Sequence, residues 1–161
     1  MYLREFTPQD ALLLFQWRCN PATVRSSFTR RAPTWDEHLS WVAKQDHRWT
    51  LIGVHAGIPV GCIRFTPDLD RGFEVHIVVA PGQRGLGYGP EMLRQGIELL
   101  PPEGEKRIDR VAGYIRVENE KSRRAFVKAG FTETFVVSEW RRQEGASPLR
   151  GEGGLDDLTL A

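Results

Sequence analysis

Residues 78–93 read VVAPGQRGLGYGPEML, and this stretch decides the fold of the chain. An apolar run ends at Pro81, four glycines then surround Arg84, and a helical pattern follows. Glycines let the backbone turn tightly and point successive N–H groups into one concavity, and the start of a helix adds unpaired donors and a positive dipole end. The stretch therefore predicts a strand, a phosphate-binding turn and a helix. A glycine-rich connection without a ligand is the alternative.

Two other kinds of nucleotide-binding turn fit less well. A Walker loop closes on a Lys followed by Ser or Thr, which this turn lacks. A dinucleotide-binding fold is disfavoured because antiparallel strands are expected before the turn. These are the β-rich runs 48–56 and 59–67, joined at Gly57-Ile58 as a tight hairpin.

The other elements follow from the spacing of apolar residues and from two capping boxes, Thr7 with Asp10 and Thr34 with Glu37. Expected strands span 2–6, 48–56, 59–67, 72–80, 107–117 and 131–140, with a last edge strand over 155–160. Expected helices span 7–18 and 34–46, then run from the glycine turn to 100 and from Asn119 to Gly130. The order is β-α-α-β-β-β-α-β-α-β in one domain, 1–161, with 21–33 expected to be loop or short turn and 143–154 a flexible loop.

Composition narrows the class of protein. The 161 residues are 40% hydrophobic and 27% charged, and the net charge of +1 gives no global attraction to nucleic acid or membrane. We find no apolar run of 18 residues and no export leader, so we expect a cytoplasmic protein. Cys19 and Cys62 lack metal-ligand spacing, so we expect reduced packing residues and no metal.

Two motifs together resemble the Gcn5-related N-acetyltransferases (GNAT). That family's pyrophosphate loop is matched by Arg84, Gly87 and Gly89. Downstream, RVENEKSRRAFVKAGF (116–131) is similar to its Asn, Ser, aromatic and Gly-Phe helix, through the residues Asn119, Ser122, Phe126, Gly130 and Phe131. The motifs lie in the family's order, and the order of elements agrees over nearly the whole chain.

The resemblance implies an α+β fold with a mixed, mostly antiparallel sheet, splayed between strands 4 and 5 and flanked by about four helices. It also implies that acetyl-CoA lies in the splay, with pantetheine along strand 4, pyrophosphate on the glycine turn and Asn119 orienting the cofactor arm. The implied cofactor-binding residues are Val78, Val79, Ala80, Arg84, Gly85, Leu86, Gly87, Tyr88, Gly89, Asn119, Ser122 and Phe126.

The catalytic residues are expected beside that cleft. Family relatives often use a carboxylate at the position of Glu74 as a base, commonly through water; a solvated or ion-paired carboxylate is the alternative. His76 lies two residues further on the same face and is the second candidate base. Many relatives carry a tyrosine acid where this chain has Phe126, so Ser122, with Tyr114 as the alternative, is expected to assist the leaving thiolate.

The resemblance also implies that the N-terminal third binds the amine, because it supplies the acceptor side of the cleft in this superfamily. Residues 11–35 contain four arginines and no acid, which favours an anionic acceptor over the alternative of a solvated basic loop. The candidate acceptor-binding residues are Trp17, Arg18, Arg25, Phe28 and Arg30. FQWRCNPATVR (15–25), with His38 and Trp41, resembles acetyltransferases of nucleotide-linked amino sugars, and also those of ribosomal-protein N-termini.

We favour a small-molecule amine, a nucleotide-linked amino sugar, over a protein α-amine. A third hypothesis is a CoA-binding module without transferase activity, because Phe126 stands where many relatives carry the tyrosine acid. Nucleic acid and membrane are not expected partners, and the sequence leaves homo-oligomerisation open.

Overall fold

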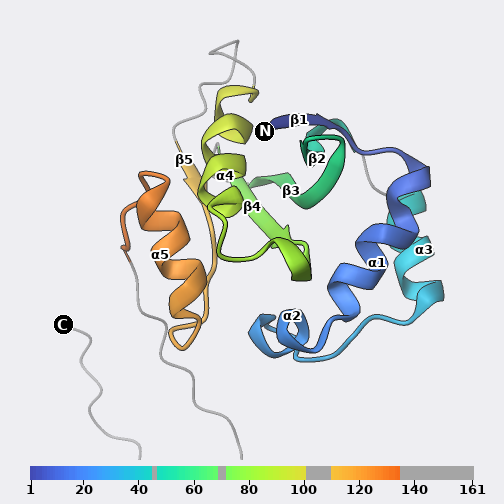
Figure 1. Cartoon of the computed structure of the whole chain (residues 1–161). Helices are drawn as coiled ribbons and strands as arrows, with labels where there is room; N and C mark the ends of the chain where they lie inside the picture. The colour runs from blue at the N-terminus through green and yellow to red at the C-terminus, as the bar shows by residue number, and fades with distance from the viewer. Residues whose placement is uncertain (45–46, 69–71, 101–109, 135–161) are drawn as a thin grey trace, which may run out of the picture.

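The computed structural model describes residues 1–44, 47–68, 72–100 and 110–134, and a five-stranded sheet organises them (Figure 1). The strands, in both spatial and chain order, are β1 (Tyr2–Glu5), β2 (Thr50–His55), β3 (Ile58–Asp68), β4 (Gly72–Val79) and β5 (Arg110–Ala112). All neighbours are antiparallel except β4 and β5, which are parallel. The predicted mixed, mostly antiparallel sheet is confirmed.

Helices cover both faces of this sheet (Figure 1). In the described residues they are α1 (Ala11–Cys19), α2 (Pro21–Ser26), α3 (Trp35–Lys44), α4 (Tyr88–Glu98) and α5 (Glu120–Lys128), with 3-10 turns η1 (Pro8–Asp10), η2 (His47–Trp49) and η3 (Pro81–Gln83). Among these residues, no helix has the length and apolar character needed to span a membrane.

The pleat of β4 separates the two layers of the core. Ile77 and Val79 pack with the cluster that contains Met92 and Leu93 of α4. Val78 packs instead with the cluster built on α1 and β2. Since successive side chains of a strand point to opposite faces, Glu74 and His76 share the face of Val78, toward α1.

Both predicted capping boxes form. The backbone N–H of Thr7 donates to Asp10 at 2.9 Å, and Arg4 holds the same carboxylate through two hydrogen bonds of 2.7 and 2.8 Å. At the start of α3, Thr34 and Glu37 exchange hydrogen bonds of 2.8 and 3.2 Å. Side-chain acceptors at a helix start bind N–H groups that have no partner within the helix.

Two predictions about local structure were wrong. Part of the 21–33 segment is helix α2, because Asn20 caps it by accepting from the N–H of Ala22 at 3.1 Å and Pro21 occupies the first helical position. The hairpin turn lies at Ala56-Gly57 rather than at Gly57-Ile58. Both Ala56 and Gly57 have positive φ, 48° and 78°, as the two-residue turn that matches strand twist requires.

The predictions for the C-terminal part are only partly testable. Of the strand expected over 107–117, the structure shows β5, and 107–109 lie outside the described residues. Residues 131–134 carry no strand. The rest of the expected strand 131–140, the loop 143–154 and the edge strand 155–160 lie outside the described residues.

Candidate active site

The glycine turn between β4 and α4 has the geometry of an anion cradle. Gly85 and Gly87 have φ of 83° and 88°, and a Cβ added to either would meet no atom within 4 Å. Gly87 is also the N-cap of α4, so the first N–H groups of that helix adjoin the turn. A Cβ added to Gly89 would be in ordinary van der Waals contact with Val79 and Ala125, at 3.6 and 3.8 Å, so the start of α4 lies close to β4 and α5.

One edge of β4 is open beside this turn. Ala80 donates its N–H to Val60 across β3 at 2.9 Å. Bonded and non-bonded pairs alternate in antiparallel sheets, so Val79, opposite Gly61, turns its N–H and C=O to the other edge. Strand β5 pairs with β4 only as far as Glu74 in the described residues. The backbone of Val79 therefore faces the gap where the two strands separate.

Arg84 ties the turn to the N-terminal helices. Its guanidinium donates to the carbonyl of Val79 at 3.3 Å, to Thr23 Oγ1 at 2.6 Å and to Asn20 Oδ1 at 3.4 Å. Thr23 and Asn20 belong to α2 and its cap. The side chain thus links the glycine turn to the segment expected to bind the acceptor.

Glu74 and His76 meet on the face of β4 toward α1. The Nε2 atom of His76 lies 3.4 Å from Glu74 Oε1, and the two side chains are 42% and 36% exposed. Burial lowers the pKa of His76, as do the charges of Arg64 and Arg18, while Glu74 opposes them. His76 is therefore neutral near pH 7 and able to accept a proton.

Three residues of the α5 motif have different surroundings: Asn119 caps the helix, Ser122 has a hydroxyl that does not cap it, and Phe126 lies in the core. Asn119 Oδ1 caps α5 by accepting from the backbone N–H of Ser122 at 3.3 Å, so the Ser122 hydroxyl is not the cap. Phe126 is 7% exposed, packs edge-on against Phe131 at 4.8 Å, and leaves no room for a Cβ on Gly113. Phe126 was expected to touch the cofactor, but its ring lies in the core. Tyr114 is 59% exposed.

The residues expected to bind the acceptor differ in how exposed their side chains are. Trp17 is 6% exposed and belongs to the core around α1, which corrects its expected role as a stacking surface. Phe28 is 57% exposed, and Arg25 also faces solvent. Arg30 forms a 2.7 Å ion pair with Glu118, whose same carboxylate oxygen also lies 2.6 Å from Arg116, so two arginines share one acid.

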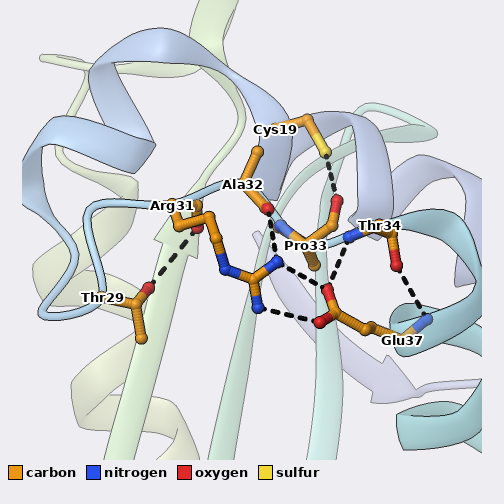
Figure 2. A network of polar contacts seen from close by, with 7 residues as sticks. All are labelled: Cys19, Thr29, Arg31, Ala32, Pro33, Thr34 and Glu37. Carbon is orange, nitrogen blue, oxygen red and sulfur yellow. Dashed lines mark hydrogen bonds and ion pairs between the residues drawn. The ribbon is translucent and has the colours of Figure 1, made fainter.

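Arg31, the fourth arginine of this basic segment, is also paired. Its guanidinium is forked on Glu37 at 2.8 and 2.9 Å, beside the Thr34 capping box (Figure 2). Arg31 lowers the pKa of Glu37 to about 2. The excess of arginine read from the sequence is thus partly neutralised in the fold.

One residue close to His76, Arg64 on β3, was not selected from the sequence. It lies opposite His76 in the sheet, and its guanidinium lies 5.4 Å from the ring centre of Trp41. The sequence signal for Arg64 was its position two residues after Cys62, because alternate residues of a strand lie on the same face. Cys62 and Cys19 are free thiols, and burial raises the pKa of Cys62 to about 12.

No group of three or more His, Cys, Asp or Glu side chains suited to a metal occurs in the described part of the chain.

A family model for the GNAT acetyltransferase domain matches residues 1–132. Among curated proteins, the chain is similar to a mycothiol acetyltransferase of Beutenbergia cavernae, at 27% identity over 120 residues, which are 73% of this chain and 37% of the relative. It is also similar to an uncharacterized N-acetyltransferase of Methanocaldococcus jannaschii, at 26% over 112 residues, 65% of this chain and 48% of the relative. The chain spans less than half the length of either.

Solved structures show the same fold at low identity. The aminoglycoside acetyltransferase AAC(6')-Ib, in complex with ribostamycin and coenzyme A, has a TM-score of 0.72 at 20% identity, over 84% of each chain. The spermidine N-acetyltransferase of Vibrio cholerae, in complex with CoA and spermine, has a TM-score of 0.67 at 18% identity, over 88% of this chain and 87% of that one. The ribosomal-protein-alanine N-acetyltransferase of Brucella melitensis gives 0.66 at 19%, over 84% and 86%.

Proposed function

The chain belongs to the GNAT acetyltransferase family, and on that premise we propose that it transfers an acetyl group from acetyl-CoA directly to a primary amine. One juxtaposition carries the proposal. The glycine turn, with Gly85 and Gly87 in left-handed conformations, lies at the end of the strand that bears Glu74. A site for a phosphate-bearing cosubstrate and a candidate base thus share one strand.

The residues present fit acetyl-CoA. The open space at Gly85 and Gly87 leaves room for a pyrophosphate against the backbone N–H groups of the turn. The open edge of β4 exposes the backbone of Val79 beside the turn, and its carbonyl, which accepts from Arg84 at 3.3 Å, keeps a second lone pair for an amide N–H of pantetheine. When bound, acetyl-CoA supplies the thioester carbonyl that the amine attacks.

The proton steps fall to side chains around that carbonyl. We assign Glu74 as the base that takes a proton from the amine through water, with His76 as the alternative, because both lie on the face toward α1. The N–H of Val79 is positioned to stabilise the developing oxyanion. Ser122, freed from capping by Asn119, donates a hydrogen bond to the leaving thiolate, and Tyr114 is the alternative.

For the acceptor we favour a nucleotide-linked amino sugar. Arg18 and Phe28, from the N-terminal third, offer a cation and an aromatic ring, and phosphate and base are the groups that such residues bind. A protein N-terminus is the alternative acceptor. A CoA-binding module without turnover is the second candidate function, favoured by Phe126 in the usual tyrosine position.

The test is release of free CoA thiol with a panel of amines: nucleotide-linked amino sugars, peptides with free N-termini, and spermine. Glu74→Gln removes the base without changing size, and we expect kcat to fall by about 10²- to 10⁴-fold. Glu120→Gln, on the exposed surface of α5, is the matched control and should retain full activity.

Each result has a distinct meaning. Full activity of Glu74→Gln rejects Glu74 as the base. Tight binding of acetyl-CoA by calorimetry without turnover on any amine favours the binding module, and absence of acetyl-CoA binding contradicts the proposed function as a whole.

A further inference from the structure

The acceptors that hold the side chain of Arg84 are all neutral. Its Nε donates to the carbonyl of Val79, its Nη2 to Thr23 Oγ1 at 2.6 Å and its Nη1 to Asn20 Oδ1 at 3.4 Å. A guanidinium has more N–H groups than these contacts use. Burial lowers the pKa of Arg84, and no acidic group among the described residues raises it. Arg84 therefore keeps both charge and donors for an anionic ligand.

Thr23 and Asn20 belong to a helix whose side chains stay outside the core. No residue of α2 is buried. Asn20 Oδ1 already accepts from the N–H of Ala22 as the cap of α2, and its contact with Arg84 is a long one, 3.4 Å. The Thr23 hydroxyl, at 2.6 Å, is the closer acceptor and does not cap the helix. The connection between α2 and the glycine turn therefore depends mainly on Thr23.

A contact that orders Arg84 before a ligand arrives favours binding of that ligand. A long side chain has many rotamers, and fixing it at the moment of binding costs free energy. Arg84 precedes Gly85, the first left-handed residue of the turn, and so adjoins the space assigned to the pyrophosphate. Part of the ordering that binding requires is thus already present in the fold.

We propose that Thr23 is a positioning residue of the acetyl-CoA site, which holds Arg84 beside the glycine turn before the cosubstrate binds. This inference rests on the proposed function, since it assigns a further residue to the same cleft. It gives α2, which begins the segment expected to meet the acceptor, a part in cosubstrate binding. A cosubstrate that fixes Arg84 should also fix α2, because a coupling between two sites acts in both directions.

Calorimetric titration of the intact protein with CoA tests the proposal. Thr23→Val keeps the branched shape of the side chain and removes its hydroxyl. We expect the Kd for CoA to rise about 2- to 10-fold, the cost of ordering one long side chain at binding. Thr23→Ser restores the hydroxyl and should restore the affinity. Thr29→Val, the matched control, removes a hydroxyl that contacts Ser27 and the carbonyl of Arg31, and should bind CoA like the wild type.

A double-mutant cycle shows whether Thr23 acts through Arg84. Arg84→Met removes every donor of the guanidinium and keeps a long side chain. In that background Thr23→Val should cause no further loss of CoA affinity, because the two residues share one contact. An equal loss in both backgrounds overturns the proposal. So does an unchanged or higher affinity in Thr23→Val alone, while melting temperatures show that each variant is folded.

Hydrogen exchange of residues 21–27 follows the same contact from the side of α2. CoA should slow exchange of these amide groups in the wild type, because binding fixes Arg84 and Arg84 holds Thr23. In Thr23→Val this protection should be lost. Protection by CoA that is equal in both proteins contradicts the coupling of α2 to the turn.

These measurements need no turnover, so they separate the inference from the proposed function. In an active enzyme Thr23→Val should raise the KM for acetyl-CoA and leave kcat unchanged. A wild type that acetylates an amine, with CoA affinity unaffected by Thr23→Val, refutes the role of Thr23 and leaves the transferase intact. A wild type that binds CoA but acetylates no amine, with affinity lowered in Thr23→Val, supports the positioning role and refutes the transferase.

Discussion

Replacing Gly87 by alanine tests whether the glycine turn is the cofactor cradle. The φ of Gly87 is 88°, in the left-handed region, and a Cβ there would meet no atom of the protein within 4 Å. The substitution therefore adds backbone strain without a steric clash, about 1–2 kcal/mol for an L-residue. If the free turn relaxes and must be restored for binding, the dissociation constant for acetyl-CoA rises by about 5- to 30-fold.

Two other glycines provide the controls. Gly57 has φ of 78° and open space around it, but lies in the β2–β3 hairpin, so Gly57→Ala should lower stability and leave acetyl-CoA affinity unchanged. Gly82 lies near the turn with open space and no left-handed conformation, so Gly82→Ala should change neither quantity. Calorimetry gives the affinity and thermal unfolding gives the stability, with about 2–4 °C expected per kcal/mol.

The comparison separates strain from function. If the Gly87→Ala turn keeps its shape, the strain appears as a lower melting temperature, and the new methyl group still occupies the space assigned to the pyrophosphate. Either way the affinity for acetyl-CoA must fall. An affinity equal to that of Gly57→Ala would refute the reasoning that this turn holds the cofactor.

Two further predictions concern stability. The pKa of Asp10 is lowered by hydrogen bonds from Arg4 and then from Thr7, so this carboxylate stabilises the fold above its ordinary pKa and loses that effect as pH falls through the lowered value. Asp10→Asn should therefore cost about 1.5–3 kcal/mol in urea unfolding at pH 7, and a gap to wild type that stayed constant down to pH 3 would contradict this. Gly61→Ala places a Cβ 2.6 Å from the carbonyl oxygen of Val78 and should cost about 1–3 kcal/mol; stability equal to that of Gly82→Ala would disprove the close approach.

Local signals explain which elements were predictable. Both capping boxes and the glycine turn depend on residues within a few positions of one another, and the structure confirms them. The segment 21–33 was not expected to hold a helix, although Asn20 followed by Pro21 begins one, as α2 shows. The predicted hairpin turn was wrong by one residue, because the turn begins at Ala56. The φ of Ala56 is 48°, and the twist of the strands, not a preference of alanine, accounts for this conformation.

The grouping of Arg18, Trp41 and Arg64 depends on contacts that sequence spacing does not contain. Arg18 and Trp41 lie on different helices, and Arg64 joins them from a strand. Only the register of β3 with β4, which sets Arg64 opposite His76, brings the charged groups together. The count of arginines in 11–35 predicted basic character, but it could not show that Arg30 already forms an ion pair with Glu118.

In the α5 motif an aromatic residue packs in the core, while the hydroxyl of a serine remains available for another role. The ring of Phe126 packs in the core against Gly113. This packing does not need the hydroxyl that a tyrosine would carry. Asn119 satisfies the backbone N–H of Ser122, so the Ser122 hydroxyl does not have to cap the helix. A transferase with phenylalanine at this position therefore needs no rearrangement of α5 to present another hydroxyl, and replacement of Ser122 by alanine should lower turnover if that hydroxyl, rather than Tyr114, assists the leaving thiolate.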